Sequence, residues 1–119
     1  MQIDIVSDTV CPWCFIGKRR LEKAMAQRPD LDFQVSWRAY QLDAQVPPDG
    51  VDRKAYMRAK FGDAPRARSM SDALREAGAA EGIAFAFDSI EKLPNTTNSH
   101  RLIRWASSAG VQNDVAERL

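Results

Sequence analysis

The sequence predicts a mixed α/β fold that opens with a strand–helix–strand unit and continues as a helical region. Two runs of alternating apolar residues, 2–7 and 31–42, have the pattern of β-strands. Between them, residues 13–27 repeat their apolar side chains with the period of an amphipathic helix. Strand, helix and strand in this order form a βαβ unit, which is nearly always right-handed with parallel strands.

The composition is that of an ordinary soluble globular protein. The chain has 119 residues, of which 45% are hydrophobic and 28% charged, enough for one domain with its own core. A net charge of +1 gives no reason to expect nucleic acid or an anionic membrane as a partner, and no apolar run is long enough to cross a bilayer. The N-terminus lacks the basic and apolar segments of a signal peptide, which predicts a cytoplasmic location.

The first helix is expected to follow a short loop at residues 8–10. Pro12 suits its first turn, where the missing N–H would have no partner in any case. Arg28-Pro29 ends it, because the residue before a proline disfavours the helical conformation. Three basic side chains are predicted to face solvent, opposite the apolar face: Lys18, Arg19 and Arg20.

The rest of the chain is predicted to be helical with short breaks. After a loop at residues 44–51, which contains two prolines and a glycine, Asp52 is a suitable cap for a helix that runs to about Phe61. Further helices are expected at residues 66–81, 97–109 and 112–119, with a break at 62–65, an extended or irregular segment at 83–93 and a turn at 94–97. Caps are available for them: Thr97 or Asn98 at one start, and Gly82 and Gly110 at two ends.

Only two strands are expected, although a two-stranded sheet rarely stands alone, and the last helix lacks a C-cap. Both features predict that the chain is the first part of a longer polypeptide. The open edge of such a sheet can pair with a second copy, so a homodimer can form. Trp37 and Trp105 are expected in the core.

The two cysteines of the chain, Cys11 and Cys14, lie between the first strand and the first helix. If Cys11 is the N-cap, Cys14 follows one turn later, and their sulfurs can come within bonding distance. Backbone N–H groups are unpaired at this end of a helix and its dipole is positive, so Cys11 is expected to be the nucleophilic thiolate. Cys14 is expected to resolve the mixed disulfide. Pro12 and Trp13 shape the site and thereby its reduction potential.

Two other interpretations of the cysteine pair carry less weight. An inert structural disulfide is disfavoured, because a bridge that closes so short a loop restrains the unfolded chain little. A zinc site needs four ligands, and His100 is the only histidine, so we predict no metal site within one chain. A metal-binding or redox-sensing module built from two chains remains an alternative.

Five further residues have a functional and a structural interpretation. His100 can act as a general acid or base, but a position on a helix surface or at an interface is favoured. Asn95 and Asn98 can contact a substrate in a cleft, but turn formation and capping are favoured. Arg38 can lie near an anionic ligand or in solvent, and both alternatives stay open. Asp8 can oppose the Cys11 thiolate or bond local backbone.

The segment Ser7-Asp8-Thr9-Val10-Cys11-Pro12-Trp13-Cys14-Phe15-Ile16-Gly17 closely resembles the active-site segment of FrnE-like oxidoreductases of the DsbA family. The resemblance continues through three later stretches, namely Val35-Ser36-Trp37-Arg38 to Leu42, Pro47-Pro48-Asp49-Gly50, and Asn95-Thr96-Thr97-Asn98-Ser99-His100-Arg101-Leu102. It implies a thioredoxin-like fold interrupted by a helical domain. Residues 1–42 match the first thioredoxin part and residues 43–119 match part of the helical insertion, while the C-terminal half of the thioredoxin fold, with its cis-proline loop, is missing.

The resemblance also implies a function. Members of this kind exchange disulfides with protein or small-molecule thiols as oxidoreductases or isomerases, and they need no cofactor beyond the redox-active disulfide. Glutathione can serve as the redox partner. Phe15 joins Asp8, Pro12 and Trp13 among the residues that shape the active site. The chain is also similar to glutathione-dependent 2-hydroxychromene-2-carboxylate isomerases, but these commonly carry serine at the position of Cys11, so the two cysteines count against that alternative.

Overall fold

The computed structural model describes residues 1–62 and 64–119, which divide into two compact units. The first unit comprises Met1–Asp43 and Thr96–Leu119, and the second comprises Ala44–Asn95. The sequence predicts one helical domain over residues 43–119, whereas Thr96–Leu119 belongs to the first unit. The physical reason is that the C-terminal helices pack on the second strand of the βαβ unit.

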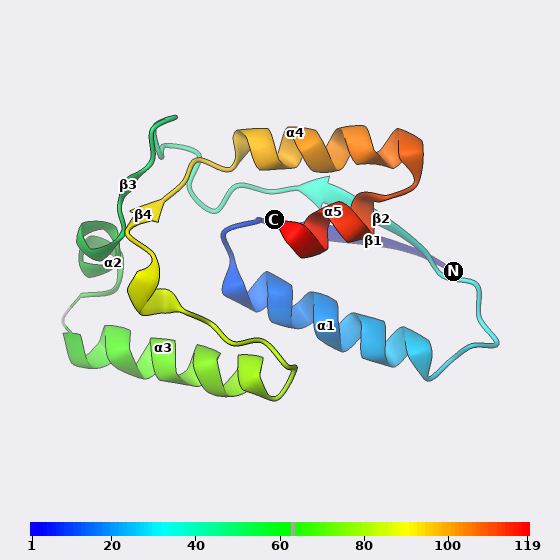
Figure 1. Ribbon diagram of the computed structural model, residues 1–119, viewed down its shortest axis with the longest axis horizontal. Helices are drawn as coiled ribbons and strands as arrows, with labels where there is room; N and C mark the ends of the chain where they lie inside the picture. The colour runs from blue at the N-terminus through cyan, green and yellow to red at the C-terminus, as the bar shows by residue number, and fades with distance from the viewer. Residues whose placement is uncertain (63) are drawn as a thin grey trace. The chain divides into compact units, whose positions relative to one another are not determined.

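The first unit contains the predicted βαβ unit, formed by β1 (Gln2–Ser7), α1 (Pro12–Ala26) and β2 (Gln34–Ala39) (Figure 1). The two strands are parallel, with Gln2 opposite Gln34 and Ser7 opposite Ala39. β2 is shorter than the predicted run of 31–42 at both ends. The N–H of Leu31 closes a turn on the Arg28 carbonyl, and that of Leu42 bonds a side chain instead of a strand.

α1 begins where the sequence predicts it, with Cys11 as N-cap and Pro12 as the first helical residue. Its apolar face is anchored by Ile16, which is 1% exposed. The prediction that the basic residues all face solvent is wrong, because Lys18 is buried. The reason is α5 (Gln112–Arg118), which places Glu117 against both Lys18 and Arg19.

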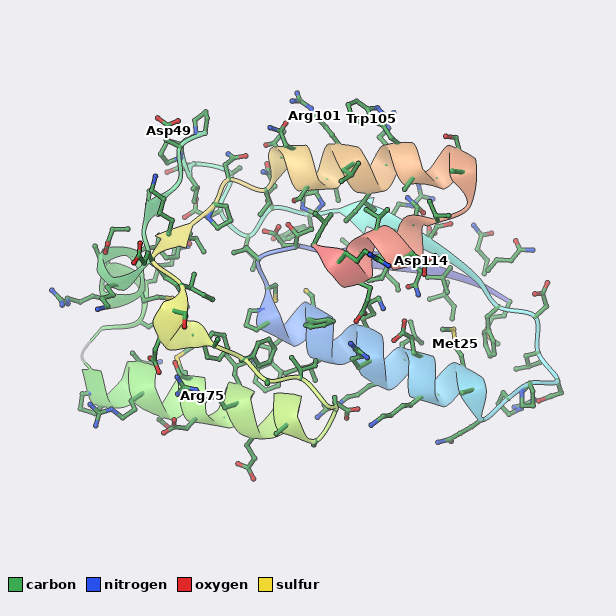
Figure 2. All side chains as sticks on the ribbon, in the orientation of Figure 1. Met25, Asp49, Arg75, Arg101, Trp105 and Asp114 are labelled. Carbon is green, nitrogen blue, oxygen red and sulfur yellow. The ribbon has the colours of Figure 1, made fainter. Side chains whose placement is uncertain are left out.

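α4 (Thr97–Ala106) covers β2 with a face formed by His100, Ile103 and Ala106. Its N-cap position is Thr96, one residue before the predicted capping residues, and the Thr96 carbonyl accepts a hydrogen bond from the N–H of His100. Trp105 is 69% exposed, so the prediction that it lies in the core is wrong. It follows Ile103 by two residues, about 200° around the helix, and Figure 2 shows it pointing away from the body of the unit.

The end of α4 tightens into a short 3-10 turn, η2 (Ser107–Ala109), before α5 begins. Gly110 ends this turn in the left-handed conformation, with φ of 69°, as the sequence predicts. α5 packs on α4 and β2, and Gln112 accepts a hydrogen bond from the backbone N–H of Trp37. Trp37 itself is half-buried on β2.

The second unit has more strands than predicted. β3 (Val51–Asp52) and β4 (Lys92–Leu93) form a small antiparallel sheet, and both are too short to show a period in the sequence. Gly50 precedes β3 with φ of 77°, and a Cβ there would lie 2.7 Å from the Leu93 carbonyl oxygen. Glycine is therefore required by both the backbone conformation and the close approach of β4.

The helices of the second unit are α2 (Arg53–Phe61), α3 (Ala64–Ala79) and the 3-10 turn η1 (Phe87–Ser89). Asp52 caps α2 as predicted, since its carboxylate accepts the Ala55 N–H at 2.7 Å. α3 starts two residues earlier than predicted, with Pro65 in its first turn rather than in a break, and it ends two residues earlier. Part of the predicted break, Asp63, lies outside the described residues. Across the described ranges, no helix has the length and apolar character needed to cross a membrane.

Candidate redox site

The two cysteines lie in the first turn of α1, at the positions that the sequence predicts. Cys11 is the N-cap with an extended backbone, and its N–H donates to the Asp8 carbonyl at 3.1 Å. Its own carbonyl accepts from Cys14 at 3.1 Å and from Phe15 at 3.3 Å. Both cysteines are half-buried free thiols. The backbone thus fixes Cys14 one turn after Cys11, on the same end of the helix.

The surroundings of the two thiols differ. Burial is the largest effect on Cys14 and raises the pKa of its thiol to about 11, although a hydrogen bond with the Asp8 backbone acts in the opposite direction. The hydrogen bond with the Cys11 side chain and the negative charges of Cys11 and Asp8 also contribute to this raised pKa. Cys14 therefore stays protonated at neutral pH. Cys11 sits at the positive end of the helix, whose first turn has no acidic residue.

The predicted shaping residues occupy distinct environments. Pro12 is the first residue of the helix, and Trp13 beside it is 51% exposed. Phe15 is half-buried, with the guanidinium of Arg19 above its ring at 5.3 Å from the centroid. Trp13 thus offers an apolar surface to solvent next to the cysteines, while Phe15 belongs to the packed side of the helix.

Asp8 is a buried carboxylate at the junction of three segments. It is 3% exposed, and its Oδ2 accepts the Leu42 N–H at 2.8 Å, while its Oδ1 lies 3.1 Å from Nε2 of His100. Asp8 bonds local backbone only through its own carbonyl, which accepts the Cys11 N–H. The carboxylate instead bonds residues distant in sequence.

His100 lies on the buried face of α4 with 9% exposure and faces the loop between β1 and α1, so it is not a helix-surface residue. One residue earlier on α4, the Ser99 hydroxyl contacts the Thr9 hydroxyl at 2.6 Å and also donates to the Thr96 carbonyl. The loop between β1 and α1 is therefore joined to α4 at two successive residues. The contacts that Thr9, Ser99 and Leu42 make around this loop were not predicted, and the signal for these three residues was their place in the stretches that resemble the family.

The remaining candidates are engaged elsewhere. Arg38 is 60% exposed at its side chain and pairs with Asp4 at 3.3 Å, as expected of a solvated strand residue. Asn98 is exposed and accepts from Arg101 at 3.0 Å. Asn95 belongs to the second unit, where it donates to the Val46 carbonyl at 2.7 Å. Turn formation and capping were the favoured interpretation of both asparagines, but Asn98 lies inside α4 and bonds Arg101, while Asn95 bonds a residue 49 positions away.

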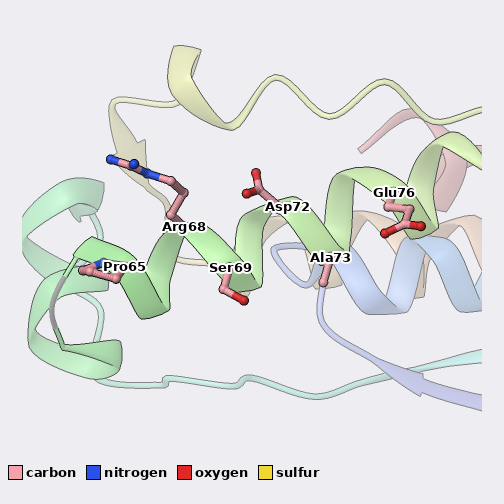
Figure 3. A pocket seen from close by; sticks show the side chains of 6 residues that line it. All are labelled: Pro65, Arg68, Ser69, Asp72, Ala73 and Glu76. Atoms are coloured by element: carbon pink, nitrogen blue, oxygen red, sulfur yellow. The ribbon is translucent and has the colours of Figure 1, made fainter.

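No other feature of the described residues competes as a site. Among residues 1–62 and 64–119, no group of three or more histidine, cysteine, aspartate or glutamate side chains is placed to hold a metal ion. A surface hollow on α3 is shown in Figure 3. It is lined by Pro65, Arg68, Ser69, Asp72, Ala73 and Glu76. This hollow lies open along one face of α3, and no sulfur or imidazole group lines it. The cysteine pair is therefore the candidate site.

Comparison with known proteins gives three results. The family model of the DSBA-like thioredoxin domain matches residues 2–119. The crystal structure of a probable DsbA oxidoreductase from Streptomyces coelicolor superposes with a TM-score of 0.83 and 33% identity, over 99% of this chain and 53% of that one. The uncharacterised protein YwbO of Bacillus subtilis (strain 168) is 34% identical over 61 residues, which is 48% of this chain and 29% of that protein. The chain thus spans about half the length of the solved structure and less of the Bacillus protein.

Proposed function

Because the chain belongs to the family of DSBA-like thioredoxin domains, we propose that it carries the redox centre of a thiol–disulfide oxidoreductase that works through Cys11 and Cys14. The expected thioredoxin-like α/β fold is confirmed by the family match and the solved structure. The observation that carries the proposal is the position of the two thiols. One is the N-cap of α1, the other follows one turn later, and both are half-buried free thiols.

The exchange proceeds in two balanced steps. The Cys11 thiolate attacks one sulfur of a substrate disulfide, that S–S bond breaks, and the departing substrate thiolate takes up a proton. Cys14 then loses its proton and attacks the Cys11 sulfur, which releases the second substrate thiol. Two electrons pass from the cysteine pair to the substrate, and the pair ends as a Cys11–Cys14 disulfide. The reverse sequence oxidises a dithiol substrate.

The order of these steps follows from the surroundings of the thiols. The raised pKa of Cys14 keeps its thiol protonated at neutral pH, so it does not compete as the first nucleophile. Trp13, exposed beside the pair, offers an apolar contact for a substrate. Asp8, Pro12 and Phe15 complete the surroundings of the site, and we assign them no chemical step.

Several further features belong to this proposal. The substrates are protein or small-molecule thiols and disulfides, with glutathione as a redox partner, and the protein acts in the cytoplasm as an FrnE-like member. Two copies pair through the strand edge that β1 leaves open within the described residues. These statements rest on the sequence and its family resemblance.

The test is a redox titration of the 119-residue chain in glutathione buffers of graded ratio, with free thiols counted at each point. We expect one reversible two-electron transition between about −270 and −120 mV. Cys14→Ser serves as the control, and it should accumulate a mixed disulfide with glutathione at Cys11. A pair that stays oxidised throughout, or one that never forms the internal bond, would contradict the proposal.

A further inference from the structure

The Asp8 carboxylate is tied to both neighbouring segments of the first unit, and this arrangement has a consequence for the redox site. Each of its oxygens faces one donor, the Leu42 N–H after β2 and Nε2 of His100 on α4. The His100 imidazole must carry its hydrogen on Nε2 to donate to a carboxylate. Its position on α4 is itself fixed by the bond from its N–H to the Thr96 carbonyl.

The carboxylate depends on these donors because it is almost fully buried. Burial of a charged group is tolerated only where hydrogen bonds replace its lost hydration. If the His100 donor is removed, one carboxylate oxygen has no described partner left, and Asp8 must turn toward water to recover one. This change moves the loop that Asp8 anchors.

Movement of that loop reaches the sulfur atoms directly. The Asp8 carbonyl accepts the Cys11 N–H, and the Asp8 backbone also bonds Cys14. A disulfide requires its two Cα atoms within about 4.4–6.8 Å and a narrow range of torsion angles. If the loop no longer fixes Cys11, the effective concentration of the Cys11 thiol near the Cys14 thiol falls, and the internal disulfide forms less readily.

We propose that His100 is a positioning residue of the redox site, which holds Asp8 and thereby the loop that presents Cys11 to Cys14. This inference rests on the proposed function and deepens it. His100 touches neither sulfur nor substrate, and it exchanges no electrons. Its contribution is to favour closure of the internal disulfide over the mixed disulfide with glutathione.

The test compares His100→Leu with His100→Gln in the glutathione titration. Leucine cannot donate to Asp8, so we expect the midpoint to become more positive, by about 30 mV for each tenfold loss of effective concentration. Glutamine can donate through its own Nε2, so it should restore the parental midpoint. If His100→Leu does not fold, His100→Asn replaces it, because its amide is too short to reach Asp8.

Thr9→Val is the matched control. It removes the other bond between the loop and α4, but Ser99 keeps its bond to the Thr96 carbonyl, so no buried group is stranded. We expect its midpoint to stay at the parental value. A shift in Thr9→Val as large as that in His100→Leu would overturn the proposal, because any loosening of α4 would then have the same effect. An unchanged midpoint in His100→Leu would overturn it as well.

A second readout separates this inference from the proposed function. Amide hydrogen exchange reports the loop whether or not the thiols exchange with glutathione, so it remains informative if the parent chain shows no redox transition. His100→Leu should speed exchange at the Cys11 and Leu42 amides by about tenfold or more, whereas Thr9→Val should not. In an Asp8→Ala background, His100→Leu should change neither readout further. An additional effect there would show that His100 does not act through Asp8.

Discussion

The ammonium of Lys18 lies 2.6 Å from the carboxylate of Glu117, so a buried lysine joins α1, the helix that carries both cysteines, to the C-terminal helix α5. The same lysine lies 2.5 Å from Glu22 one turn further along α1, and Glu117 also pairs with Arg19. The Lys18 side chain is only 4% exposed. Its charge is therefore withdrawn from water and depends on the two carboxylates that face it.

Glu117→Gln is predicted to destabilise the protein by about 1–3 kcal/mol, because Lys18 keeps one carboxylate but loses the other in a buried position. The free energy of unfolding from a urea titration at neutral pH measures this loss. Asp4→Asn is the matched control, since it breaks the exposed pair with Arg38, and it should cost no more than about 0.5 kcal/mol. Equal losses in both variants would contradict a special role for the buried pair.

Acid is predicted to weaken the same junction. Burial acts to raise the pKa of Glu22, but the hydrogen bonds from Lys18 and Asn113 outweigh it and hold that pKa below the ordinary value of 4.5. A carboxyl whose folded pKa is depressed adds stability above its unfolded pKa and loses it as pH falls through the folded value. The urea midpoint should therefore drop as pH falls below 4.5, and Glu22→Gln should make this drop smaller. An identical pH dependence in the variant would count against the prediction.

Much of the redox site could be predicted because its determinants are local. The strand pattern before residue 8, the helix period after Pro12 and the spacing of the cysteines place Cys11 at the N-cap of α1 without any knowledge of distant contacts. The same holds for Asp52, whose capping of α2 depends on the Ala55 N–H three residues away.

What escaped prediction depends on residues far apart in the sequence. Lys18 is buried by Glu117, 99 positions later, and His100 reaches Asp8 across 92 positions. The amphipathic period of α4 shows that one face is buried, but it does not say which segment covers it. Trp105 was assigned to the core by its residue type. Its exposure shows that the position of a residue on the helix decides whether its side chain is buried.

Gly50→Ala is predicted to destabilise the second unit by about 1–3 kcal/mol. The new Cβ would meet the Leu93 carbonyl oxygen at 2.7 Å, and the φ of 77° is unfavourable for alanine. Thermal unfolding measures the change. Gly17→Ala is the control in helix α1, where a Cβ has open space, and it should stabilise the protein by up to about 1 kcal/mol. A neutral effect at Gly50 would mean that β3 and β4 can separate without cost.

The thiol of Cys14 is predicted to titrate above its ordinary value even when Cys11 is absent. In Cys11→Ala, the hydrogen bond and the charge of Cys11 are lost, so the pKa should fall below about 11. It should stay above 9.0, because burial is the largest cause and remains. Thiolate absorbance against pH measures it, with the same variant unfolded in urea as the reference near 9.0.

The Asp8 carboxylate adds a second, separable part to this shift. Asp8→Asn in the Cys11→Ala background removes its negative charge and should lower the pKa of Cys14 further. A folded pKa above the unfolded one also means that the reduced protein is stabilised below pH 9.0 and loses that stability as pH rises toward 11. Cys14→Ser should lack this alkaline loss. A Cys14 that titrates at 9.0 in the folded variant would show that the thiol is hydrated, and the order of the two exchange steps would then need another cause.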